Sequence, residues 1–118
     1  MDFKKLNERS NDYIIDLYFE YIGKINFLTA LEEFSHGSGF GILDAGCEFA
    51  QNFKNWEDGY FGDNGVQILF SPPLVEQDES FVINADDFFR GIERAITRFG
   101  FNHLQCEEHL KHIREKVK

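Results

Sequence analysis

The stretch Val66–Asn84, VQILFSPPLVEQDESFVIN, contains two strand patterns separated by a proline pair and an acidic run. In VQILF, the apolar residues at 66, 68 and 70 have the two-residue period of a strand that buries one face. Pro72 and Pro73 end this strand because proline has no N–H group to donate to a sheet. The connection Ser71–Ser80 is too short for a helical crossover, so the strands VQILF and FVIN are predicted to pair antiparallel.

Two strands alone are marginally stable in water, so helices must cover one of their faces. Asn84 is a suitable N-cap for a helix after FVIN, and Asp86 and Asp87 favour the positive end of its dipole. Gly100 is a suitable residue to end this helix. Its predicted buried stripe contains Phe88, Phe89, Ile92, Ala95, Ile96 and Phe99.

The N-terminal third predicts a helical hairpin. N-cap residues at 10–12, SND, precede a helix that Gly23 can end. Its apolar residues recur at three- and four-residue spacing: Tyr13, Ile14, Leu17, Tyr18, Tyr21 and Ile22. A shorter helix then buries Phe27, Leu28, Leu31 and Phe34, and Gly37 suits the position just after its end.

From Gly37 to Gly65 the periodicity fails, and frequent glycine, asparagine and aspartate predict loops with a short helical turn around 51–56. The last segment, NHLQCEEHLKHIREKVK (102–118), is helical by composition. The predicted fold class is α+β: an N-terminal helical hairpin, an irregular Gly-rich middle, and a small antiparallel β-sheet packed against C-terminal helices. All of it is expected to form a single domain, residues 1–118.

The composition predicts a soluble, cytoplasmic protein. An apolar fraction of 42% with 14 phenylalanines excludes disorder, and 118 residues suffice for a sizeable core. The start, MDFKKLNERS, lacks the apolar run of a signal peptide, and no apolar segment is long enough to cross a bilayer. Cys47 and Cys106 are therefore expected to be reduced thiols.

The net charge of −9 is concentrated in the middle of the chain. Residues 32–87 contain twelve acids and one base, giving −11, whereas residues 1–31 carry −1 and residues 88–118 carry +3. Nucleic acids and anionic membranes are bound by basic surfaces, so neither is an expected partner. The acidic band either keeps the protein soluble or steers it toward a basic partner protein.

The glycines of HGSGFGILDAGCEF (36–49) do not form a nucleotide-binding loop. Gly37, Gly39 and Gly41 follow a predicted helix, whereas the dinucleotide fingerprint follows a strand and has another spacing. Carboxylates at Asp44 and Glu48 would repel a phosphate. We interpret the stretch as a tight chain reversal.

Metal or thiol chemistry is an alternative that the sequence leaves open. His103, Cys106, His109 and His112 step by three along one predicted helix, and each step turns the direction by about 60°, so all four cannot bind one ion. A zinc ion held by two of them with Cys47 or His36, or a Cys–His nucleophile, would make a small metal- or thiol-dependent enzyme or sensor. Without a complete signature, no catalytic residue, metal site or cofactor is predicted.

Aromatic side chains crowd the acidic middle of the chain: Phe40, Phe49, Phe53, Trp56, Tyr60 and Phe61. Some of them must pack to hold irregular segments together. Aromatic anchors surrounded by charge are also typical of protein-binding surfaces, and Phe49, Trp56 and Tyr60 are the anchors we consider.

The order of these features resembles one family, the small ribonuclease-toxin immunity proteins of bacterial contact-dependent growth inhibition (CDI) systems. The resemblance covers about residues 27–99. It rests on FLTALEEF, GSGFG, CEF, Trp56, GVQILF, FVIN and the helix DDFFRGIERAITRF.

The resemblance implies a cytoplasmic, non-enzymatic inhibitor that binds the C-terminal domain of a cognate toxin stoichiometrically. The toxins of this group are typically ribonucleases with basic surfaces, so an acidic surface would occupy the site that binds the RNA phosphate backbone. An acidic adaptor for another basic protein is the alternative. The expected contact residues lie in or beside the irregular segments: Asp44, Glu48, Trp56, Glu57, Asp58, Tyr60, Asp63, Glu76, Asp78 and Glu79.

Overall fold

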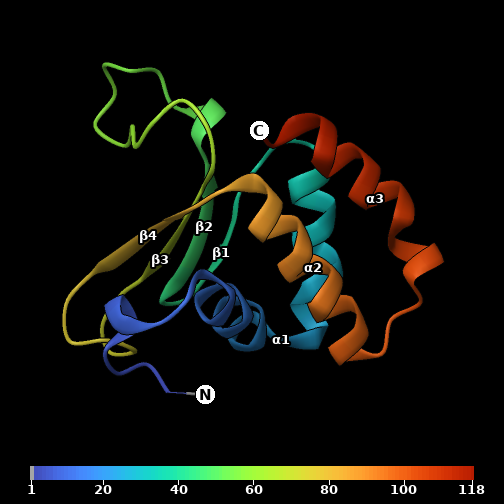
Figure 1. Ribbon diagram of the computed structural model, residues 1–118, viewed down its shortest axis with the longest axis horizontal. Coiled ribbons are helices and arrows are strands. Elements are labelled where there is room, and N and C mark those ends of the chain that lie inside the picture. Colours follow the sequence, from blue (N-terminus) through green and yellow to red (C-terminus); the bar gives the residue numbers. More distant parts are fainter. Residues whose placement is uncertain (1) are drawn as a thin grey trace.

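The computed structural model describes residues 2–118 and confirms the α+β class. Its helices are α1 (Asn11–Ser35), α2 (Ala85–Phe99) and α3 (His103–Lys116), and its strands are β1 (Phe40–Ile42), β2 (Ala45–Phe49), β3 (Val66–Phe70) and β4 (Glu79–Ile83). Two short 3-10 turns, η1 (Leu6–Glu8) and η2 (Ala50–Asn52), complete the order of elements. The strands form one antiparallel sheet in the order β1-β2-β3-β4, with the helices gathered on one side of it (Figure 1).

The predicted pairing of VQILF with FVIN is confirmed. β3 and β4 are antiparallel neighbours, with Val66 opposite Ile83 and Ile68 opposite Phe81. The apolar residues of β3 face the core, as predicted: Val66, Ile68 and Phe70 are fully buried. The side chains between them face the opposite side of the sheet.

The prediction of loops throughout the glycine-rich stretch is wrong for residues 40–49. These residues form the hairpin β1–β2, in which Phe40 lies opposite Cys47 and Ile42 opposite Ala45. The glycines serve close packing: a Cβ on Gly39 would lie 2.0 Å from the carbonyl oxygen of Cys47. Apolar residues alternate with glycines and Glu48 across both strands, but frequent glycine also favours loops, and this signal outweighed the two-residue period in the prediction.

The expected helical hairpin is a single element, α1, with a break inside it. Gly23 has φ 80° and ψ 168°, which is not helical, at the residue where the first helix was expected to end. The Ser10 side chain accepts the N–H of Tyr13 at the start of α1, and Gly37, with φ 82°, follows its C-cap. Both capping predictions are therefore confirmed.

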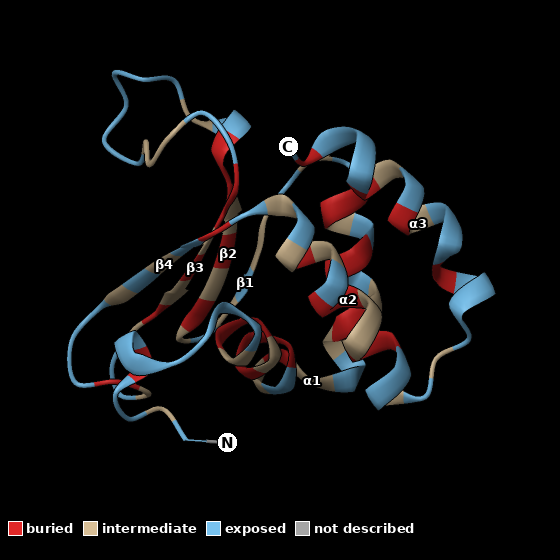
Figure 2. Cartoon of the chain, in the orientation of Figure 1, coloured by how far each residue is buried: buried red, intermediate tan, exposed pale blue. Residues whose placement is uncertain are grey.

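The core lies between the sheet and the helices (Figure 2). α1 packs directly on the sheet, whereas α2 and α3 pack mainly on α1, so the C-terminal helices form an outer layer. Three rings from three elements meet at the centre: Phe34, Phe49 and Phe88 have centroids 5.4–5.9 Å apart. Phe49 is fully buried, so its consideration as a binding anchor is corrected.

α1 and α2 approach each other closely at Gly91. A Cβ added there would lie 2.2 Å from Cγ2 of Ile15 and 3.3 Å from its Cβ. Ile15 is fully buried and branched at that carbon, so it cannot turn away, and the helices would have to separate.

We expect Gly91→Ala to lower the free energy of unfolding by about 1–3 kcal/mol, the usual effect of overpacking. Urea unfolding of the wild type and the variant measures this. Combining it with Ile15→Ala should give a loss smaller than the sum of the two single losses, because the clashing methyl group is then absent. Helix propensity alone predicts the opposite sign, a gain of about 1 kcal/mol, and such a gain would contradict the steric argument.

Candidate functional site

Within the described part of the chain, no element covers the face of the sheet that points away from the helices (Figure 1). Its outward side chains alternate with the buried ones, and none of them is buried: Gly41, Gly46, Glu48, Gln67, Leu69, Ser80 and Val82. Val82 is an apolar residue that is 53% exposed. The alternation in β3 and β4 could have indicated Leu69 and Val82 from sequence, but the sequence analysis did not select them.

The segment between β2 and β3, residues 50–65, is a closed loop that projects from one end of the sheet (Figure 1). The N–H of Ala50 donates to the carbonyl of Gly65 at 3.0 Å, so the two ends of the loop meet. The C-terminal residues also bind the base of the loop. Gly65 N–H donates to the Lys118 carbonyl at 2.6 Å, and the Gln51 side chain donates to the Lys116 carbonyl. This is the form of an Ω-loop with a fixed base.

The loop also packs against itself and leaves its tryptophan outside. Phe53 and Phe61 are in ring contact at 6.0 Å, and Gly59 lies so close to Phe53 that a Cβ would be 2.4 Å from its ring. Trp56 is 75% exposed, and its only cationic neighbour over the ring, within residues 2–118, is the Lys54 ammonium at 5.2 Å. The loop therefore presents a large aromatic surface on a folded support.

Tyr60 has a more specific partner in the same loop. Its hydroxyl donates to Asp63 Oδ1 at 2.5 Å, and this hydrogen bond raises the pKa of the Tyr60 hydroxyl above its usual value. Glu57 accepts the N–H of Lys54 at 3.0 Å. Both acids thus help to shape the loop while their charges remain at the surface.

A second apolar tip lies at the opposite end of the sheet. Leu43, in the β1–β2 turn, is 88% exposed and has φ 52°, a left-handed conformation that is unusual for leucine and costs on the order of 1–2 kcal/mol. The carbonyl of Asp44 beside it accepts the N–H of Ser71 at 2.8 Å, which joins the turn to the β3–β4 connection. Glycine would fit this backbone without strain, so the leucine is not explained by the fold.

The ten predicted contact residues are thus divided between two ends of the sheet. Five lie in the Ω-loop: Trp56, Glu57, Asp58, Tyr60 and Asp63. Asp44, Glu76, Asp78 and Glu79 lie at the other end, and Glu48 lies on the outward face of β2 between them. The ends are about 17 Å apart, the length of a five-residue strand.

Acids occur in both layers, whereas the bases lie almost entirely outside the sheet layer. The ion pairs of residues 2–118 join side chains within the helical layer, such as Arg94 with Asp16 at 3.0 Å, Arg98 with Asp16 at 3.3 Å and Arg114 with Glu93 at 2.5 Å. Residues 36–84, between α1 and α2, hold eight acids and one base, giving −7. None of these eight acids, all of them predicted contact residues, takes part in an ion pair within the described chain.

A family model described as CDI immunity protein matches residues 11–113, which span all the helices except the last turn of α3 and all the strands. The chain belongs to the CDI immunity protein family. No individual curated protein matches it. The resemblance noted from the sequence is confirmed, and the chain accordingly has an immunity function against a CDI toxin.

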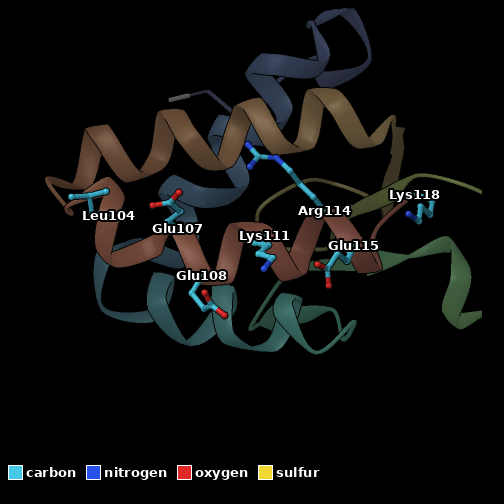
Figure 3. A pocket seen from close by; sticks show the side chains of 7 residues that line it. All are labelled: Leu104, Glu107, Glu108, Lys111, Arg114, Glu115 and Lys118. Carbon is cyan, nitrogen blue, oxygen red and sulfur yellow. The ribbon is translucent and has the colours of Figure 1, made fainter.

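Other parts of this immunity protein offer little for chemistry. The hollow along α3 is lined by side chains of both charges, and Arg114 turns out of it toward α2, where it meets Glu93 (Figure 3). Across residues 2–118, no three histidine, cysteine, aspartate or glutamate side chains are arranged to hold a metal ion. Of the α3 residues considered as ligands, His103 bonds Thr97 and Cys106 is buried. No helix in this range has the length and apolarity to span a bilayer.

The two cysteines are free and buried. Burial raises the pKa of the Cys47 thiol well above its usual value, and the nearby charge of Glu48 adds to this effect. The Tyr18 hydroxyl beside it, which donates to the Phe40 carbonyl at 2.6 Å, also has a pKa raised by burial. A neutral, enclosed thiol is a poor nucleophile.

We expect the immunity protein to lose stability as the pH rises above about 8.5, the usual pKa of a thiol. There the unfolded chain releases the Cys47 proton while the folded protein retains it, so alkaline pH favours unfolding by about 1.4 kcal/mol per pH unit for this group. Urea unfolding from pH 7 to 10 measures the slope. Cys47→Ala should flatten it, and parallel slopes for the two proteins would contradict this assignment.

Proposed function

We propose that this immunity protein neutralises a basic ribonuclease toxin by binding it one to one with its sheet side and covering the toxin's RNA-binding surface or active site. The observation that carries the proposal is the set of eight acids without ion-pair partners between α1 and α2. Acids that serve only the fold would be expected to share the available arginines, as Asp16 does. These acids leave their charge for a partner.

Coulomb attraction supports this partner choice. A ribonuclease binds a polyanion, so its substrate groove is positively charged, and a surface of −7 complements it. Such pairing raises the association rate, which suits an inhibitor that must reach the toxin before RNA does. Surface attraction of this kind weakens as salt screens it.

Trp56 would supply the apolar part of the contact. Tryptophan is the residue most enriched among interface anchors, and this one stands exposed on a self-packed loop whose base is fixed. A fixed loop loses little conformational entropy on binding. Glu57, Asp58 and Asp63 lie in the same loop and would supply rim charges.

Inhibition would require no chemistry by the immunity protein itself. The buried thiols and the paired arginines leave recognition, rather than catalysis, as the role of the described surface. The proposed site residues are the ten predicted from the sequence. The encounter with the toxin would take place in the cytoplasm, where the toxin would find its RNA substrate.

The direct test is titration of the protein into the toxin domain encoded beside it, with RNA cleavage as the readout. We expect cleavage to stop at one equivalent, with weaker protection as salt rises from about 0.05 to 0.3 M. Because Trp56 is the sole tryptophan of the chain, 5-fluorotryptophan labelling gives one ¹⁹F signal, which should shift at the same stoichiometry. Binding without loss of RNA cleavage would refute the ribonuclease part of the proposal.

We expect the pair Glu76→Gln and Asp78→Asn to slow toxin association about 3- to 10-fold and to flatten its salt dependence, since steering depends on the local charge. Both residues are exposed and make no ion pair within residues 2–118, so the fold should tolerate the amides. The matched control is Glu107→Gln with Glu108→Gln in α3, which changes the net charge equally on the helical layer. Equal slowing by both pairs would assign the effect to net charge rather than to the sheet side.

A further inference from the structure

The outward face of the sheet is a regular surface that no element of residues 2–118 covers (Figure 1). Across β2, β3 and β4 it carries small or uncharged residues at most positions, with Gly46 opposite Leu69 and Leu69 opposite Ser80. A Cβ added at Gly46 would lie 3.9 Å from Leu69 Cδ1, an ordinary van der Waals distance, so the Leu69 side chain lies beside the glycine. Because these side chains are small or uncharged, few charged side chains project from this part of the sheet.

Exposed large apolar residues gather around this face. Of the five in residues 2–118, three belong to the sheet or its end loops: Leu43, Trp56 and Val82. The other two, Ile25 and Leu104, lie on helices. Val82 projects from the face itself, whereas Leu43 and Trp56 lie at its opposite ends.

The face alone is too small to form a stable protein interface. Four strands at about 4.8 Å spacing and about 17 Å length give a surface of about 300 Å². A stable protein complex buries about 800 Å² on each partner, so the end loops must contribute. Contact with the end loops that carry Leu43 and Trp56, including their acids, would supply the remainder.

We propose that the toxin domain docks across the outward face of the sheet, contacting Val82 on the edge strand β4, with Leu43 and Trp56 at the two ends of the contact. This inference rests on the proposed function and names the surface that performs it. Leu43 and Val82 are then specificity residues, and the two groups of acids are parts of one interface.

Charge selects a basic toxin over a second copy of this chain as the occupant. Two copies joined by this face would bring together their Glu48 side chains and two surfaces of −7. A basic partner meets the same acids with attraction. Self-association of the wild type through Val82 is accordingly an outcome that would overturn the proposal.

The test compares three variants in binding assays with the toxin domain encoded beside this chain. Val82→Arg places bulk and a positive charge on the outward face, where it would meet a basic partner, and should weaken binding tenfold or more. Val82→Thr keeps the β-branched shape and should stay within about threefold of the wild type. Leu104→Arg makes the same apolar-to-arginine change on α3, where the side chain is 77% exposed, and should also stay within about threefold.

Leu43→Gly keeps the test independent of folding defects. Glycine fits the left-handed conformation at φ 52°, so this variant should be at least as stable as the wild type. We expect it nevertheless to bind the toxin about 3- to 10-fold more weakly, because the exposed side chain is lost. Greater stability with weaker binding cannot arise from partial unfolding.

The outcomes separate the two proposals. Wild-type binding with unchanged affinity in Val82→Arg and Leu43→Gly would overturn the docking surface and leave the immunity proposal standing. Equal weakening by Leu104→Arg would also overturn the docking surface. A wild type that neither binds nor inhibits the toxin would overturn both proposals. A wild-type dimer that Val82→Arg dissociates would assign the face to self-association.

Discussion

The three-ring contact of Phe34, Phe49 and Phe88 is the constraint on which the rest of the structure depends. These fully buried rings come from α1, β2 and α2, so one packing event joins the sheet to both helical layers. Aromatic pairs with this geometry contribute about 0.5–1.5 kcal/mol each beyond the area they bury. Once β2 is held in this way, the hairpin partner β1 and the neighbour β3 have a fixed plane on which to pair.

That plane separates two kinds of surface. On the helical side, arginines of α2 and α3 meet carboxylates of the neighbouring helices, so charge there is largely balanced within the protein. On the sheet side the acids have one lysine among them. Self-repulsion on this side opposes folding slightly, and the segregation is therefore a feature that stability alone does not favour.

Local signals predicted the helices well. The Asn84 cap, the apolar stripe of α2 and Gly100 act within one segment, and each has its physical cause in neighbouring residues. The β3–β4 pair was predictable for the same reason, because proline and a short connection restrict the partners. The hairpin β1–β2 escaped detection because its strands are short and rich in glycine, which also favours loops, although their apolar residues do alternate.

The site was only partly predictable because exposure is a tertiary property. Phe49 and Trp56 look alike in the sequence, yet one fills the core and the other stands in solvent, since β2 pairing ends between them. The closure of the Ω-loop by Lys116 and Lys118 joins residues more than fifty positions apart, which no short pattern encodes. The eight acids among the predicted contact residues form no ion pair within residues 2–118, but their division between two ends of the sheet follows only from its register.

The strict alternation of β3 and β4 has a consequence for how such a protein can change over generations. Inward side chains carry the stability, and outward ones touch no other layer, so a substitution at Gln67, Leu69, Ser80 or Val82 leaves the inherited fold almost untouched. Descendants of this protein that meet a new toxin could therefore change their specificity by substitutions at these outward positions, while selection at the inward positions preserves the common fold.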